Sequence, residues 1–120
     1  MLFRSGIVLQ AYAALGGQDG TKQKWKDLLD GTTLLQCPVV MHIATSCSVT
    51  PAQVLLRYAL QRNCAVTPKT TSMDRMKENA NLFHFQLSSE QMKLLDDLQV
   101  PGDAGRLCWR TDPLRMLDFE

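Results

Sequence analysis

Two short apolar runs stand out along the chain, and each is bounded by residues that end regular structure. Residues 7–12 are mostly apolar and lie between Gly6 and the pair Gly16-Gly17. Their length and β-branched start predict a strand buried on both faces. Residues 64–67 form a second short run, ended by Pro68, and predict a second strand.

Helical spacing of apolar residues fills the stretch before the second run. Pro38 suits the first position of a helix that extends to about Thr45. A capping box follows, in which the Thr50 hydroxyl accepts from a first-turn amide and the Gln53 side chain reaches back to the cap amide. The next helix is therefore expected to run from this box to about Arg62.

Two further helices are predicted after the second strand. Ser72 is suited to cap a helix over residues 73–82, with Asp74 near the positive end of its dipole. The last helix begins at a second capping box, residues 88–91, and extends to about residue 98. Residues 16–36 are interpreted as a long surface loop with one candidate helical turn at Trp25, Leu28 and Leu29, and residues 103–120 as a tail.

The order of these elements predicts the fold class. A strand, helices, a second strand and a helix indicate an α/β fold with parallel strands joined by a right-handed crossover. Two strands are few, because a parallel sheet needs partners at both edges and cover on both faces. We therefore expect the chain to be part of a larger architecture.

Composition and charge narrow the class of protein. The chain has 120 residues, of which 45% are hydrophobic and 21% charged, as expected for one globular domain and not for a disordered or collagen-like chain. Its 13 basic and 12 acidic side chains give a net charge of +1, so nothing favours a nucleic-acid partner. No apolar run approaches the roughly 18 residues of a membrane span, and the amino terminus lacks the layout of a signal peptide. We expect no membrane partner and a cytoplasmic location.

The cysteines do not suggest a metal site. Cys37, Cys47, Cys64 and Cys108 show no CxxC spacing, and His42 and His84 are the two histidines of the chain. Reduced thiols that pack as small hydrophobes are the expected state of these residues.

Candidate chemistry lies where the two predicted strands end, because ligands of α/β folds gather at the carboxyl ends of strands. Lys69 follows the second strand, and the hydroxyls of Thr70, Thr71 and Ser72 lie at a helix start. Free amides, a helix dipole, hydroxyl donors and a lysine together form an anion site. The candidate set is completed by residues that share one helix face, namely Arg75, Glu78 and Asn79.

Each of these residues also has a simpler interpretation. The lysine and arginine fit a solvated helix face with a capping serine, and Tyr12 fits a core aromatic at a strand end. Tyr58 lies among leucines and is expected to pack, while His42 and His84 are expected at a helix surface and at the edge of the core. A phosphate or nucleotide site is thus one of two interpretations of the same positions.

Several segments together resemble the aldo-keto reductase signature. They are residues 10–12, 50–57, 68–70, 75–79 and 83–88, which read QAY, TPAQVLLR, PKT, RMKEN and FHFQLS. The resemblance extends to about residue 98. It implies an NADP(H)-dependent oxidoreductase on a (β/α)8 TIM barrel, of which residues 1–120 form a partial, carboxy-terminal domain. This part comprises about two β/α units, an extra helix and the tail at residues 103–120.

The resemblance also implies roles for individual residues. The tyrosine at Tyr12 stacks on the nicotinamide ring, and Leu15 is a further candidate residue of the cofactor site. Lys69 and Arg75 hold the 2′-phosphate of the adenosine ribose, helped by the segment from Thr70 to Ser72. Glu78 and Asn79 meet the adenine. Where the family usually has Ser-Pro after the stacking tyrosine, this chain has Ala13-Ala14, which alters the loop beside the nicotinamide.

No segment matches the catalytic Asp, Tyr, Lys and His of the family. The first hypothesis is therefore a fragment or truncated form of an NADP(H)-dependent aldo-keto reductase, inactive alone, whose parent reaction is hydride transfer between NADPH and an aldehyde or ketone. A carbonyl substrate is expected only when the rest of the barrel is present. The alternatives are a non-enzymatic nucleotide-binding or interaction module, and a poorly folded, inactive splice product that self-associates through open sheet edges.

Overall fold

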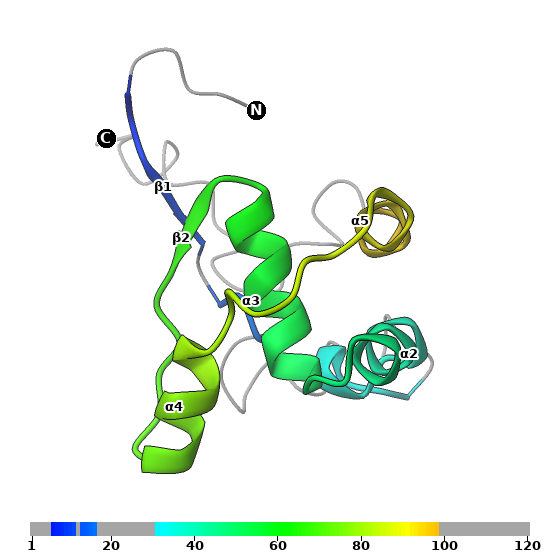
Figure 1. Ribbon diagram of the computed structural model, residues 1–120, viewed down its shortest axis with the longest axis horizontal. Helices are drawn as coiled ribbons and strands as arrows, with labels where there is room; N and C mark the ends of the chain where they lie inside the picture. Colours follow the sequence, from blue (N-terminus) through cyan, green and yellow to red (C-terminus); the bar gives the residue numbers. More distant parts are fainter. Residues whose placement is uncertain (1–5, 12, 17–30, 99–120) are drawn as a thin grey trace, which may run out of the picture.

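The computed structural model describes residues 6–11, 13–16 and 31–98. In these ranges two short strands alternate with helices (Figure 1). The elements in chain order are β1 (Leu9–Ala11), the 3-10 helix η2 (Leu34–Gln36), α2 (Pro38–Cys47), α3 (Pro51–Gln61), β2 (Cys64–Val66), α4 (Met73–Ala80) and α5 (Ser89–Asp96).

The helix starts follow the local signals in the sequence. At α3 the amide of Gln53 donates to the Thr50 hydroxyl at 3.2 Å, and the Thr50 amide donates to the Gln53 side chain at 3.0 Å. The same reciprocal pair joins Ser88 and Gln91 at the start of α5. Both predicted capping boxes are therefore confirmed, and Pro38 and Pro51 occupy the first helical turns as proline prefers.

The helix ends differ from the predictions by about two residues. Helix α2 continues past Thr45 to Cys47 and stops where Ser48 adopts a left-handed conformation, with φ of 55°. Helix α4 ends at Ala80, two residues before the predicted end, because Leu82 turns away to be buried with 3% of its surface exposed. The loop predicted over residues 16–36 contains η2 at its end. The candidate turn at residues 25–29 and the tail at 103–120 lie outside the described residues.

The two strands pair in parallel, which confirms the predicted α/β class. The register pairs Leu9 with Cys64 and Ala11 with Val66. Helix α3 packs against β2, and β1 lies beside β2 (Figure 1).

The prediction that the first strand is buried on both faces is wrong. Ile7 and Val8 expose 63% and 73% of their surface, and Leu9 exposes 46%. The apolar run has the composition of a covered strand, but among the described residues β1 has a neighbour at one edge alone. Burial depends on that cover, and the local sequence does not supply it.

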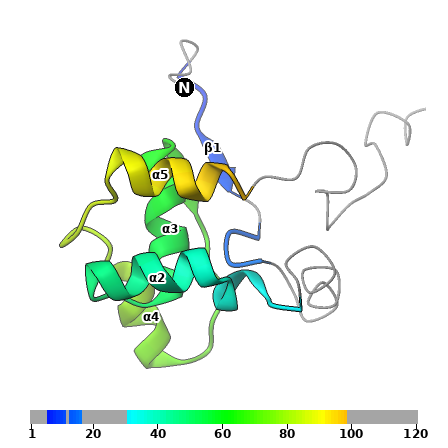
Figure 2. The same cartoon turned by 90° about the vertical axis from the view of Figure 1, so that its right-hand side faces the viewer.

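The hydrophobic core lies between α2, α3 and α5, on the side of α3 away from the strands (Figure 2). Val40, Ile43 and Val54 are almost completely buried, with 0%, 1% and 0% exposed. The cluster also contains Cys37, Ala44, Leu55, Leu87 and Leu95. Three helices therefore enclose an apolar centre of their own, and Cys37 contributes to it as a small hydrophobe.

Other side chains lie as follows. Cys37, Cys47 and Cys64 are free thiols, and within the described ranges no group of three His, Cys, Asp or Glu side chains is placed to hold a metal ion. His42 is on the exposed surface of α2, as predicted. His84 is exposed rather than at the core edge, and its ring is tilted against the Phe85 ring with the two centroids 5.1 Å apart. Across the part of the chain that the structure describes, no single helix is long and apolar enough to cross a membrane; α2 and α3 together reach that length and composition, but they are bent by 90° at their junction.

Candidate functional site

The carboxyl ends of the two strands lie side by side. Because Ala11 pairs with Val66, the segments that follow the strands leave the same edge of the sheet. The Gln10 side chain donates to the Thr67 hydroxyl at 3.2 Å and ties the two exits together. The structure thus brings the segment at residues 13–16 and the segment at 67–72 to the place where ligands bind in α/β folds.

The segment after β2 forms the start of α4. The Thr70 hydroxyl accepts from the amide of Ser72 at 3.1 Å, and the Ser72 hydroxyl accepts from the amide of Arg75 at 3.4 Å, so Ser72 is the N-cap as predicted. Both hydroxyls keep a proton to donate, and the other first-turn amides have no carbonyl of their own helix to bond. Lys69 precedes this cap and Arg75 follows it in the sequence, and both side chains are exposed. The arrangement presents hydroxyl and amide donors beside two cations.

A hollow of about 240 Å³ opens beside this helix start. It lies between the segment after β2 and one face of α4, and it is lined by Pro68, Thr70, Met76, Asn79 and Ala80. Pockets that enclose a complete drug-sized ligand have about 300–1,000 Å³, so this one suits one end of an extended ligand. Two of the predicted site residues, Thr70 and Asn79, line it together.

Glu78 has a partner that the sequence did not predict. Its carboxylate Oε1 accepts a hydrogen bond of 2.6 Å from the Thr50 hydroxyl, which caps α3. The Gln53 side chain of the same cap donates to the backbone carbonyls of Glu78 and Asn81, both at 3.1 Å. The amino end of α3 and the last turn of α4 are therefore joined through polar contacts.

The comparison with known proteins agrees with this architecture. The sequence model of the aldo/keto reductase family matches residues 1–100. The chain belongs to the aldo/keto reductase family. Estradiol 17 beta-dehydrogenase 5 of Mus musculus is 47% identical to it over 92 residues, which are 77% of this chain and 28% of that protein. Prostaglandin-E(2) 9-reductase of Oryctolagus cuniculus is 43% identical over 93 residues, which are 78% of this chain and 28% of that protein.

A solved structure shows a similar fold. The aldose reductase from Schistosoma japonicum superposes with a TM-score of 0.60 at 40% identity, over 78% of this chain and 26% of that one. This aldo/keto reductase chain thus spans about a quarter of the length of the relatives that it matches.

The remaining predicted site residues are not gathered in the hollow. Tyr12 lies outside the described residues. Leu15 is half-buried and packs against the hydrophobic cluster of α2, α3 and α5. Thr71 is exposed, two residues past Lys69. Within the described part of this aldo/keto reductase chain, the candidate site is therefore built by the segment 68–72 together with α4.

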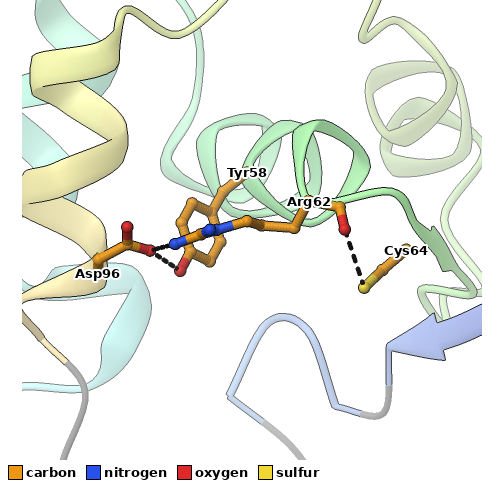
Figure 3. Close-up of polar contacts among 4 residues, drawn as sticks. All are labelled: Tyr58, Arg62, Cys64 and Asp96. Atoms are coloured by element: carbon orange, nitrogen blue, oxygen red, sulfur yellow. Dashed lines mark hydrogen bonds and ion pairs between the residues drawn. The ribbon is translucent and has the colours of Figure 1, made fainter. Parts of the chain in front are cut away.

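A second polar cluster of the chain joins α3 to α5 (Figure 3). The Tyr58 hydroxyl donates to Asp96 Oδ1 at 2.5 Å, and the Arg62 guanidinium contacts the same oxygen and lies 5.7 Å over the Tyr58 ring. Burial and the bond to Asp96 raise the pKa of Tyr58 above its ordinary 10.0, and the bonds from Tyr58 and Arg62 lower the pKa of Asp96 below 3.8. Tyr58 packs against the core as predicted, and its hydroxyl adds a link to α5 that the sequence did not predict.

Proposed function

We propose that this chain carries the adenosine 2′-phosphate half of an NADP(H) site and corresponds to the carboxy-terminal part of a (β/α)8 barrel. In this proposal residues 1–120 form a partial aldo/keto reductase domain, with two β/α units, the extra helix α5 and a tail at 103–120. The observation that carries the proposal is the capped start of α4, at the shared carboxyl edge of two parallel strands, with Lys69 and Arg75 beside it.

The groups present fit the adenosine end of such a cofactor. Lys69 and Arg75 supply positive charge for a phosphate, and the hydroxyls of Thr70, Thr71 and Ser72 supply donors at a helix start. Asn79 lines the hollow, and Glu78 precedes it on α4. An extended ligand with a phosphate at the cap and a flat, amino-bearing base in the hollow matches both the charge and the size of this surface.

The other end of the cofactor site is assigned to Tyr12 and Leu15, after β1. When bound, NADPH supplies the hydride for reduction of an aldehyde or ketone. The chain's own residues are proposed to bind and orient the adenosine end, and they include no match to the family's catalytic residues. We therefore expect no turnover by this chain alone, and a carbonyl substrate only together with the rest of a barrel.

Binding of adenosine 2′,5′-bisphosphate to the 120-residue chain, measured by calorimetry, tests the proposal. The double variant Lys69→Ala/Arg75→Ala is expected to bind about a hundredfold more weakly, because two hydrogen bonds to a charged group are lost. Lys77→Ala/Lys93→Ala removes the same charge from other exposed positions of α4 and α5 and is the matched control. Equal losses in the two double variants, or no binding by the unmodified chain, would contradict the proposal.

Self-association is a second proposed property, favoured by a separate observation. Ile7, Val8 and Leu9 expose apolar surface along β1. An exposed apolar strand with an unpaired edge is a template for pairing with another chain. We propose that copies of this chain associate through β1, whether the chain acts as a nucleotide-binding module or is an inactive product.

A further inference from the structure

The contact between the start of α3 and the end of α4 contains more hydrogen bonds than capping requires. In the capping box, the Thr50 hydroxyl needs only to accept, and the Gln53 side chain needs only its carbonyl oxygen. Here the Thr50 hydroxyl also donates to Glu78, and the Gln53 amide nitrogen donates to two carbonyls of the α4 end. These extra donors all point from α3 to α4.

Gln53 makes this contact a buried one. Its exposed fraction is 6%, and it is the one buried polar residue in the described ranges. Its oxygen bonds inside α3, and its nitrogen uses both protons outside it. Helix α4 contributes no buried side chain of its own, so these hydrogen bonds are a main part of what fixes its last turn.

We propose that Thr50 is a positioning residue for base recognition. Its hydroxyl holds one oxygen of the Glu78 carboxylate, and this selects a rotamer in which the carboxylate accepts from the exocyclic amino group of adenine. Glu78 is half-buried on α4, and the following residue, Asn79, lines the hollow. The inference rests on the proposed NADP(H) function and deepens it, since it names the residue that sets the preference for an amino-bearing base.

The rival interpretation is that Thr50 only fastens two helices together. A fastening role predicts that removal of the hydroxyl bond lowers stability and weakens every ligand of the site equally. A positioning role predicts a change in the choice between bases. Inosine carries a carbonyl oxygen where adenosine carries the amino group, so a fixed carboxylate repels inosine and accepts from adenosine.

The experiment compares adenosine 2′,5′-bisphosphate with inosine 2′,5′-bisphosphate on the full 120-residue chain. Thr50→Ser and Thr50→Asp both keep an oxygen that caps α3, so both are expected to fold. Serine keeps the donor to Glu78, whereas an ionised aspartate has none. Any effect of the added charge on the phosphates applies to both ligands and cancels in the ratio of their dissociation constants.

The unmodified chain is expected to bind the adenosine ligand about tenfold or more tightly than the inosine ligand. Thr50→Ser is expected to keep this ratio, and Thr50→Asp to bring it close to one. Thr50→Val, which keeps the shape of threonine without the hydroxyl, tests the same loss without added charge. If both Thr50→Asp and Thr50→Val keep the ratio of the unmodified chain, the positioning role is wrong while the proposed function stands. If the unmodified chain binds neither ligand, the proposed function fails and this inference fails with it.

Discussion

The helical side of the molecule and its strand side differ in how they bury apolar surface. On the helical side, α2, α3 and α5 enclose Val40, Ile43 and Val54 almost completely. On the strand side, Ile7 and Val8 of the segment leading into β1 are largely exposed. The helical region buries its apolar side chains mainly against one another, whereas β1 has the composition of a buried strand but stays exposed among the residues that the structure describes.

The candidate site lies at the boundary between these two regions. Helix α4 has no buried residue, and polar contacts from Thr50 and Gln53 join it to α3. A self-contained core therefore supports a site whose own elements contribute little apolar burial. The position of α4 consequently depends on a few hydrogen bonds, and single substitutions can change it.

The largest expected effect is on the free energy of unfolding, which should respond strongly to a substitution in the helical core and weakly to one next to β1. Ile43→Ala should lower the free energy of unfolding by about 2–5 kcal/mol, because it removes buried methyl groups and leaves a cavity. Val8→Ala, which shortens an exposed side chain, should change it by less than about 0.5 kcal/mol at protein concentrations at which the chain is monomeric. Urea unfolding followed by circular dichroism measures both.

Ile43→Val provides a milder variant if Ile43→Ala does not fold, with an expected loss of about 0.5–1.5 kcal/mol. Similar losses for Val8→Ala and Ile43→Ala would mean that β1 is as well covered as the helical core. That result would remove the contrast between the two regions.

The parts of the fold that could be predicted from sequence are those with local causes. The start of α3 is set by Thr50 and Gln53, and the start of α5 by Ser88 and Gln91. The two residues of each pair lie within one helical turn of each other. The burial of β1 could not be predicted in this way. A run such as residues 7–12 indicates a preference for apolar surroundings, but the surroundings come from other parts of a fold.

The same distinction holds for the candidate site. The segment from Lys69 to Arg75 was predicted because a strand end, hydroxyls and a helix start follow each other in the sequence. The bonds of Thr50 to Glu78 and of Tyr58 to Asp96 join residues 28 and 38 positions apart. No spacing rule connects such pairs, and both involve side chains that also fit a local role, as a cap or as a core aromatic.

Self-association provides the second test of the strand side. Val8→Lys places a charge next to β1 and should weaken association of the chain about a hundredfold, because a buried valine contributes about 1.5 kcal/mol in each of the two copies. Met41→Lys adds the same charge at an exposed apolar position of α2 and should leave association unchanged. Sedimentation velocity over a range of concentrations measures both, and a monomeric unmodified chain would contradict the proposal.

The smallest expected effect concerns the link between α3 and α5 on the helical side. Tyr58→Phe removes the hydroxyl that donates to Asp96 and should lower the midpoint of thermal unfolding at neutral pH by a few degrees or less, since the partner carboxylate lies at the surface.

The contribution of this hydrogen bond depends on pH at both of its ends. Because folding lowers the pKa of Asp96, the stabilisation by the ionised carboxylate is present above pH 3.8 and is lost as the pH falls through the pKa of the folded state. Because folding raises the pKa of Tyr58, the stabilisation by the protonated hydroxyl is present below pH 10.0 and is lost as the pH rises through the pKa of the folded state. The difference in midpoint between the unmodified chain and Tyr58→Phe should therefore be largest between about pH 5 and pH 9 and should decrease at lower and at higher pH.

The control variant Asp96→Asn keeps the shape of the side chain without the acid titration. In the Asp96→Asn variant, the difference in midpoint caused by Tyr58→Phe should no longer decrease in acid. A difference that stays constant from acid to alkaline pH would show that the hydroxyl contributes packing alone and that this side of the molecule is held by its apolar core.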